Sequence, residues 1–201
     1  MKLNVPFFIQ KDNTDCGIIS LKMAFSFLRK NIPYDLIEKL ADKKQNKSLW
    51  TINLAIASAK LGFKTKFISK SIHFNPNNLN LDFYKKYSDE NFINQSEQLI
   101  KKAEHNGVIL EEKSVNLAEI TKNLSQNSIL IVLLNWNIMK EKEAFHGHFV
   151  PIVGFDKENI YIHNSSIECP ASNLAVKRDL FDRARKSQGT DEDILVISNN
   201  I

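Results

Sequence analysis

The segment from Gln10 to Phe27, QKDNTDCGIISLKMAFSF, places one cysteine between a polar stretch and a strongly apolar stretch that has the pattern of a helix. Apolar side chains surround the predicted helix on nearly all sides, and the polar ones form a narrow stripe made of Lys22, Ser26, Arg29 and Lys30. Such a helix must be covered by other elements, since its apolar sides would otherwise face water. We therefore expect the rest of the chain to pack around it.

The cysteine of this segment, Cys16, lies at the expected N-terminus of the helix. Unpaired backbone N–H groups and the positive end of the helix dipole meet there, which favours a thiolate over a thiol. We expect Thr14 or Asp15 to cap the helix and Gly17 to let a substrate backbone approach the sulfur. A single buried cysteine is more often a small core residue. The polar run before it and the glycine after it are unusual for core filling, so we interpret Cys16 as a nucleophile.

Length and composition indicate one domain. A chain of 201 residues with 43% apolar side chains can bury a single core, so we expect one papain-like domain over residues 1–201 once the similarities described below are considered. The net charge of +4 is small and dispersed, which argues against a nucleic-acid partner. The apolar runs are too short for a signal peptide or a membrane span, so we expect a cytoplasmic protein without a membrane partner. The sequence leaves the oligomeric state open.

The two cysteines, Cys16 and Cys169, form neither a disulfide framework nor a paired zinc motif. A bridge between them is not expected in a reducing compartment, and Cys169 is interpreted as an incidental thiol. His146, His148 and His163 lack a further ligand at a suitable spacing, so we predict no metal site. We also expect no cofactor.

The order of the predicted elements indicates the fold class. Helical periodicity or capping signals predict further helices at 34–41, 49–61, 91–106, from Asn116 onward with a capping box to Glu119, and at 174–186. Strand patterns occur at 5–9, 63–69, 108–113, 128–135, 148–155, 160–164 and 193–198. Helices come first and most strands come last. This order predicts an α+β domain in which the N-terminal helices pack on a mostly antiparallel sheet.

A thiol nucleophile needs a base, a group that orients the base, and donors for the oxyanion. His148 begins one apolar strand and Asn164 ends the next, both within the papain-type spacing of roughly 130–150 residues after the cysteine. On neighbouring antiparallel strands, the Asn164 amide oxygen would accept a hydrogen bond from the imidazole. Gln10, six residues before Cys16, is a candidate oxyanion donor together with the Cys16 backbone N–H.

Each of these residues also has an ordinary structural interpretation. His148 is compatible with a hydrogen-bonded strand histidine, Asn164 with a turn residue, and Gln10 with a surface position. His146 lies two residues before His148 and is the main alternative base. The acidic run at 191–193 is typical of a solvated turn before the last strand.

Two segments, VPFFIQKDNTDCGIISLKMAF and GHFVPIVGFDKENIYIHNSS, resemble the papain-like bacteriocin-processing, double-glycine leader peptidase superfamily. The chain is more similar still to the guanylyl-cyclase-domain-containing proteins of the same structural superfamily, through DCGIISLKM, SLWTINLAIASAKLGFKTKF, FYKKY, GHFVPIVGFD, IYIHN and RKSQGTDEDILVIS. This resemblance spans nearly the whole chain and implies a papain-like fold. It also implies Cys16 as nucleophile, His148 as base, Asn164 as orienting residue and Gln10 as oxyanion donor. Leader peptidases commonly have aspartate at the position of Asn164, often followed by proline where Ser165 stands here.

Three functions remain open at this point. The leading hypothesis is a cysteine hydrolase, a peptidase or amidase, that acts on a peptide or amide substrate through an acyl-thioenzyme. The family name raises guanylyl cyclase, which would bind a nucleotide and convert GTP to cyclic GMP. That reaction needs phosphate-binding groups and usually metal-binding carboxylates, and the sequence contains no G-x-x-x-x-G-K-[ST] loop. The third is an inactive binding module with the same fold.

Overall fold

A computed structural model describes residues 1–87 and 92–199. Its seven strands are β1 (Lys64–Ser69), β2 (Ile109–Glu112), β3 (Ser128–Asn135), β4 (Gly147–Phe155), β5 (Asn159–Asn164), β6 (Ala171–Lys177) and β7 (Ile194–Ser198). They form one sheet in the order β2-β1-β7-β3-β4-β5-β6. In this sheet β1 and β2 are parallel and the other described neighbours are antiparallel. The prediction of a mostly antiparallel sheet is confirmed.

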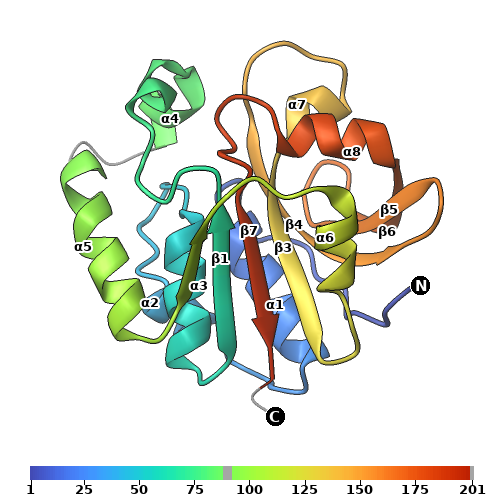
Figure 1. Cartoon of the computed structure of the whole chain (residues 1–201), viewed down its shortest axis with the longest axis horizontal. Coiled ribbons are helices and arrows are strands. Elements are labelled where there is room, and N and C mark those ends of the chain that lie inside the picture. Colours follow the sequence, from blue (N-terminus) through green and yellow to red (C-terminus); the bar gives the residue numbers. More distant parts are fainter. Residues whose placement is uncertain (88–91, 200–201) are drawn as a thin grey trace.

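Helices cover both faces of the sheet (Figure 1). Their bounds are α1 (Cys16–Phe27), α2 (Tyr34–Leu40), α3 (Thr51–Lys60), α4 (Asp82–Tyr87), α5 (Phe92–His105), α6 (Leu117–Lys122), α7 (Trp136–Met139) and α8 (Arg178–Arg185), with a 3₁₀ helix at Pro76–Asn80. In Figure 1, α1 and α3 lie behind the sheet, and α6 and α8 lie in front of it. The α+β class is therefore confirmed, and so is the capping box that starts α6. The predicted helix at 91–106 begins at Phe92, and residue 91 lies outside the described residues.

The apolar pattern of α1 has the predicted result, because the helix is enclosed. Its buried residues include Ile18, Leu21 and Phe25, and the hydroxyl of Ser20 donates to the carbonyl of Phe149 in β4 at 3.2 Å. Gly17 also has a role in packing. A Cβ there would lie 3.1 Å from a side-chain carbon of Leu54 in α3 and 3.3 Å from one of Phe149. The glycine lets α3 and β4 approach the start of α1.

One predicted element is wrong, and another begins later than predicted. Residues 5–9 form no strand. The Val5 carbonyl bonds to the His163 ring of β5 at 3.0 Å, and Leu3, just before this segment, donates its N–H to the Val153 carbonyl of β4 at 2.7 Å. The predicted helix at 174–186 begins only at Arg178, because residues 174–177 belong to β6 and pair with β5. Pairing with a neighbouring strand outweighed the helical pattern of these residues. Helix α4 was not predicted.

The strand β7 lies in the centre of the sheet, between β1 and β3. Its residues Ile194, Leu195 and Ile197 are fully buried, as expected for a strand covered on both faces. This placement brings the turn that precedes β7 to the end of the sheet where α1 begins. No helix of the described part of the chain is long and apolar enough to cross a membrane.

Candidate functional site

Cys16 is the first residue of α1 and lines a cavity of about 60 Å³ together with Gly147 and Phe149 of β4. The thiol is half-buried and free of any disulfide. The backbones of Phe149 and Gly17 lie near the sulfur. The sulfur is thus held against β4, beside the residue that follows His148.

The cap of α1 differs from the prediction. Asp15 occupies the N-cap position but makes no side-chain cap hydrogen bond. Its carboxylate instead accepts a hydrogen bond from the Tyr34 hydroxyl and lies 3.7 Å from the Lys43 ammonium. Asp12 braces the preceding turn by accepting hydrogen bonds from the backbone and hydroxyl of Thr14, each at 2.7 Å. The loop before the cysteine is therefore anchored to α2 and to the segment that follows it.

Burial raises the pKa of the Cys16 thiol above its ordinary value. The backbones of Phe149 and Gly17 act in the opposite direction and lower this pKa, and the charge of Asp15 raises it. We expected the helix N-terminus to favour a thiolate, but loss of solvent contact outweighs that effect. The resting site holds a neutral thiol at neutral pH.

His148 and Asn164 are in contact. Both are buried, with 4% and 1% of their surfaces exposed, and His148 Nε2 lies 3.0 Å from Asn164 Oδ1. The Asn164 amide nitrogen donates to Ser166 Oγ at 3.0 Å and to the Cys169 carbonyl at 2.5 Å. Both amide protons are therefore used, so Oδ1 must face the imidazole. It follows that Nε2 carries the proton and Nδ1 carries the lone pair of a base.

Burial lowers the pKa of His148 to about 4, while the hydrogen bond to Asn164 acts in the opposite direction. His148 is therefore neutral at pH 7, in the state that can accept a proton. The indole of Trp136 packs beside the imidazole, with 4.9 Å between ring centroids. Thiol and imidazole are thus both neutral at rest, and no ion pair is formed in advance.

The structure does not join all of the predicted site residues. Within the described ranges, no hydrogen bond connects the Cys16 sulfur to the His148 ring; the link between them is the β4 backbone at Phe149. His146 is exposed and packs near Phe83, at 5.7 Å between ring centroids. His163 is fully buried and bonds to the Val5 carbonyl, which is a structural role.

Gln10 lies beside the end of β5. Its backbone N–H donates to the Ser165 carbonyl at 3.0 Å, and its side-chain oxygen accepts from the Ser165 hydroxyl at 3.2 Å. The side-chain nitrogen donates to the Asp12 carbonyl at 2.7 Å. The structure therefore brings Gln10 close to the residue after Asn164, while one of its amide protons is directed to the loop before Cys16.

The acidic run before β7 is part of the site, which corrects our interpretation of a solvated turn. Asp193 lines the same cavity as Cys16 and accepts a hydrogen bond from the Thr51 hydroxyl at 2.5 Å. Asp191 also lines the cavity and accepts from the Asn78 amide at 2.7 Å. A signal was present in the sequence: an uninterrupted apolar strand is typical of a sheet centre, and residues at the end of a central strand are well placed to line a site.

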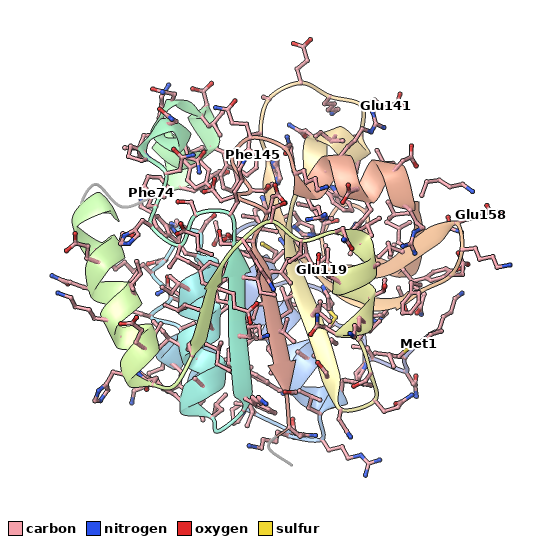
Figure 2. The ribbon with its side chains drawn as sticks, in the orientation of Figure 1. Met1, Phe74, Glu119, Glu141, Phe145 and Glu158 are labelled. Atoms are coloured by element: carbon pink, nitrogen blue, oxygen red, sulfur yellow. The ribbon has the colours of Figure 1, made fainter. Side chains whose placement is uncertain are left out.

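Part of the remaining wall of the cavity is aromatic and is formed by Trp50, Phe74, Phe83 and Tyr84. Trp50 and Phe74 lie 4.7 Å apart between ring centroids. In Figure 2, the labelled Phe74 and Phe145 lie at the same end of the molecule. Among residues 1–87 and 92–199, no group of three or more His, Cys, Asp or Glu side chains has an arrangement that could hold a metal ion.

An Asn164→Asp substitution is expected to raise the pKa of His148 from about 4 toward the ordinary value, because a carboxylate stabilises the imidazolium. The variant should also lose stability, since the Cys169 carbonyl needs a donor that aspartate lacks. This need explains an asparagine at the position. NMR titration of the histidine rings measures the effect, and Asn173→Asp, beside His163, is the control. A His148 midpoint that stays near pH 4 would contradict the orienting contact.

Sequence comparisons identify two similarities. A sequence model of the family described as guanylylate cyclase matches residues 5–197. Among curated proteins, guanylyl cyclase 1 of Arabidopsis thaliana is 29% identical over 214 residues, which cover 98% of this chain and 76% of that protein. The resemblance to guanylyl-cyclase-domain-containing proteins is confirmed.

Solved structures share the fold. A C39-like peptidase from Bacillus anthracis has a TM-score of 0.60 at 14% identity, covering 100% of this chain and 98% of that chain. The peptidase domain of Streptococcus ComA, a bifunctional ABC transporter, has a TM-score of 0.55 at 12% identity, with 98% and 100% covered. A double-glycine motif protease from an AMS/PCAT transporter, solved with its leader peptide, has a TM-score of 0.55 at 16% identity, with 99% and 94% covered. The predicted papain-like cysteine peptidase fold is confirmed.

Proposed function

The chain belongs to the guanylylate cyclase family, and for this member we propose a hydrolytic function, that of a cysteine peptidase or amidase acting through an acyl-thioenzyme. One observation carries the proposal. The Cys16 thiol lies against the backbone of Phe149, directly after a histidine whose tautomer is fixed by Asn164. A nucleophile, a neutral base and an orienting amide are thus supplied by adjoining elements. The leader peptide bound to one structural relative supports a peptide as substrate.

In the proposed reaction, Cys16 and His148 begin as neutral groups. His148 Nδ1 takes the thiol proton while the sulfur attacks the substrate carbonyl, and the imidazolium then gives that proton to the leaving amine. Water releases the acyl group in the second half of the cycle. The sulfur and the imidazole must approach one another when substrate binds, as catalytic hydrogen bonds often tighten only in the substrate complex.

The oxyanion formed in each half of the cycle needs donors. We assign this role to the Cys16 backbone N–H and to Gln10. An amide nitrogen has two protons, and the bond to the Asp12 carbonyl uses one of them. The other is the donor in the proposed mechanism. Removal of one oxyanion donor typically lowers kcat by about 10²–10³-fold.

The test compares two reagents on the intact chain. A peptidyl acyloxymethyl ketone, which binds as a substrate does, is expected to label Cys16, whereas iodoacetamide is expected to label the exposed Cys169 first. The reason is that burial keeps Cys16 a thiol until a bound substrate brings the base into reach. Peptide mass spectrometry locates each adduct.

A Cys169→Ser variant is the matched control and should keep the peptidyl label on Cys16. A His148→Ala variant should lose that label and keep the iodoacetamide label on Cys169. Peptidyl labelling of Cys16 that survives His148→Ala would contradict the assignment of the base. Absence of labelling together with absence of hydrolysis would favour the third hypothesis, an inactive binding module.

Cyclisation of GTP is a second candidate, favoured by the family description and by two carboxylates, Asp191 and Asp193, in the cavity. Carboxylates of this kind can hold a divalent metal ion against nucleotide phosphates. Production of cyclic GMP from GTP and magnesium that persists in Cys16→Ala and is lost in Asp193→Asn would support the cyclase and overturn the hydrolase.

A further inference from the structure

The cavity beside Cys16 combines a half-buried carboxylate, Asp193, with a wall of aromatic rings. The carboxylate comes from the turn before β7, and the rings come from residues 50–84. The proposed chemistry at Cys16 uses none of these side chains. They line the part of the cavity that a substrate would meet next to the bond to be cleaved.

Asp193 has more acceptor capacity than its neighbours fill. A carboxylate offers about four acceptor positions, and the Thr51 hydroxyl fills one. The Ser69 hydroxyl also contacts Asp193, but its single proton is shared with the carbonyls of Ser71 and Asp191. Among the ion pairs of the described residues, none involves Asp193. Within residues 1–87 and 92–199, the carboxylate is a recessed anion that no ion pair joins to a cationic side chain.

A second excess of acceptors lies next to Asp191. Asn78 is 1% exposed and donates its amide nitrogen to Asp191, but its Oδ1 has no hydrogen-bond partner among the described residues. Buried acceptors of this kind are normally satisfied. Asn78 itself does not line the cavity. At this end a ligand meets the carboxylates of Asp191 and Asp193, and these acceptors favour a ligand that brings hydrogen-bond donors.

Aromatic faces select among donor-rich ligands. Trp50, Phe74 and Tyr84 form a continuous series, with 4.7 Å and 5.8 Å between successive ring centroids. Rings attract an ammonium or a guanidinium group through cation–π interaction. The guanidinium is planar, carries five donors and matches a carboxylate in shape.

We propose that this cavity binds the cationic side chain of an arginine or lysine residue of the substrate, with Asp193 as the residue that sets this specificity. The inference rests on the proposed hydrolase in that the same substrate would present its scissile carbonyl to Cys16. Arginine is preferred over lysine, because its planar guanidinium group can both bind the carboxylate and stack on the ring faces.

The protonation of Asp193 provides an independent readout. Burial raises the pKa of Asp193 to about 7, so a cation must displace a proton below that pH. The other titratable groups at this cavity are Asp191, Tyr84 and Cys16, and Lys70 acts on Asp191. Affinity for a cation is expected to rise by up to about tenfold per pH unit from pH 5 to 7 and to level off above pH 7.

The test uses the full chain carrying Cys16→Ala, so that binding is measured without turnover. N-acetyl-arginine methylamide and its neutral isostere, N-acetyl-citrulline methylamide, are titrated calorimetrically at pH 8. The arginine probe is expected to bind about tenfold more tightly or better. Adding Asp193→Asn should remove this difference, whereas adding Asp179→Asn, an exposed acid with the same charge change, should preserve it.

Equal affinity for the two probes would overturn the inference, and so would tight binding of guanosine or of magnesium alone that abolishes arginine binding. Asp193→Asn should fold at least as stably as its parent at pH 8, because removing a recessed, unpaired charge relieves its desolvation. A preference for arginine in a chain that never forms an acyl-thioenzyme would refute the hydrolase only. Hydrolysis without preference would refute the cation site only.

Discussion

A Cys16→Ala variant is expected to lose hydrolysis of peptide and amide substrates, with kcat/KM lowered by about 10³-fold or more. The substitution removes the nucleophile, and a neighbouring water cannot form the acyl-thioenzyme in its place. The measurement is release of a fluorescent amine from peptidyl amides at pH 7–8. Since alanine is smaller than cysteine and the site is half-buried, the fold should be retained, which circular dichroism checks.

Cys169→Ala provides the control for this result, because that thiol is exposed. It should keep full activity. Cys16→Ser gives a second test, since serine retains the shape of the side chain but is a far weaker nucleophile at this site. Hydrolysis that persists in both Cys16 variants would contradict the proposed mechanism, whatever the specificity of the cavity.

An Arg185→Ala variant is expected to lose about 3–5 kcal/mol of unfolding free energy. Arg185 is 0% exposed and donates to the Val115 carbonyl at 2.7 Å, to Asp182 and to Glu192. Its removal leaves Glu192 and the carbonyl buried without this partner. Urea denaturation measures the loss, and Arg183→Ala on the same helix, where the side chain is exposed, should change stability by less than about 0.5 kcal/mol.

The same variant should also loosen the turn that contributes Asp191 to the wall of the cavity. The guanidinium of Arg185 binds Glu192 and so holds one side of the turn that presents Asp191. The backbone carbonyl of residue 185, which accepts a hydrogen bond from the Thr190 hydroxyl at 2.6 Å, is kept in the variant. Asp191 and Glu192 adopt positive φ angles of 46° and 56°, which such contacts must maintain. A loss of stability below about 1 kcal/mol would show that the turn holds this conformation without the arginine.

The strongest sequence predictions concerned segments with a clear pattern of apolar residues. The apolar pattern of α1 predicted an enclosed helix, and the continuous apolar run 128–135 predicted a buried strand. Both are confirmed, because burial of apolar side chains determined those elements. Residues 174–177 were assigned to the wrong element because their pairing with β5 depends on contacts that no local pattern contains.

The site was predictable in part. Order and spacing identified His148 and Asn164, which the structure places 3.0 Å apart, while their catalytic roles remain predictions. The sequence could not predict that Thr51 would meet Asp193, because that contact joins residues 142 positions apart. Nor could it predict a neutral thiol at rest, since desolvation depends on everything packed around Cys16.

The central position of β7 has a consequence for how the chain is made. During synthesis, β1 and β2 emerge first and β3 to β6 follow, and these two groups are connected in the sheet only through β7. Until residues 194–198 leave the ribosome, the nascent chain can form two partial sheets but cannot join them, and domains generally fold only as complete units. The carboxylates that precede β7 arrive at the same moment. The protein therefore acquires its fold and its cavity together, once residues 194–198 have been made.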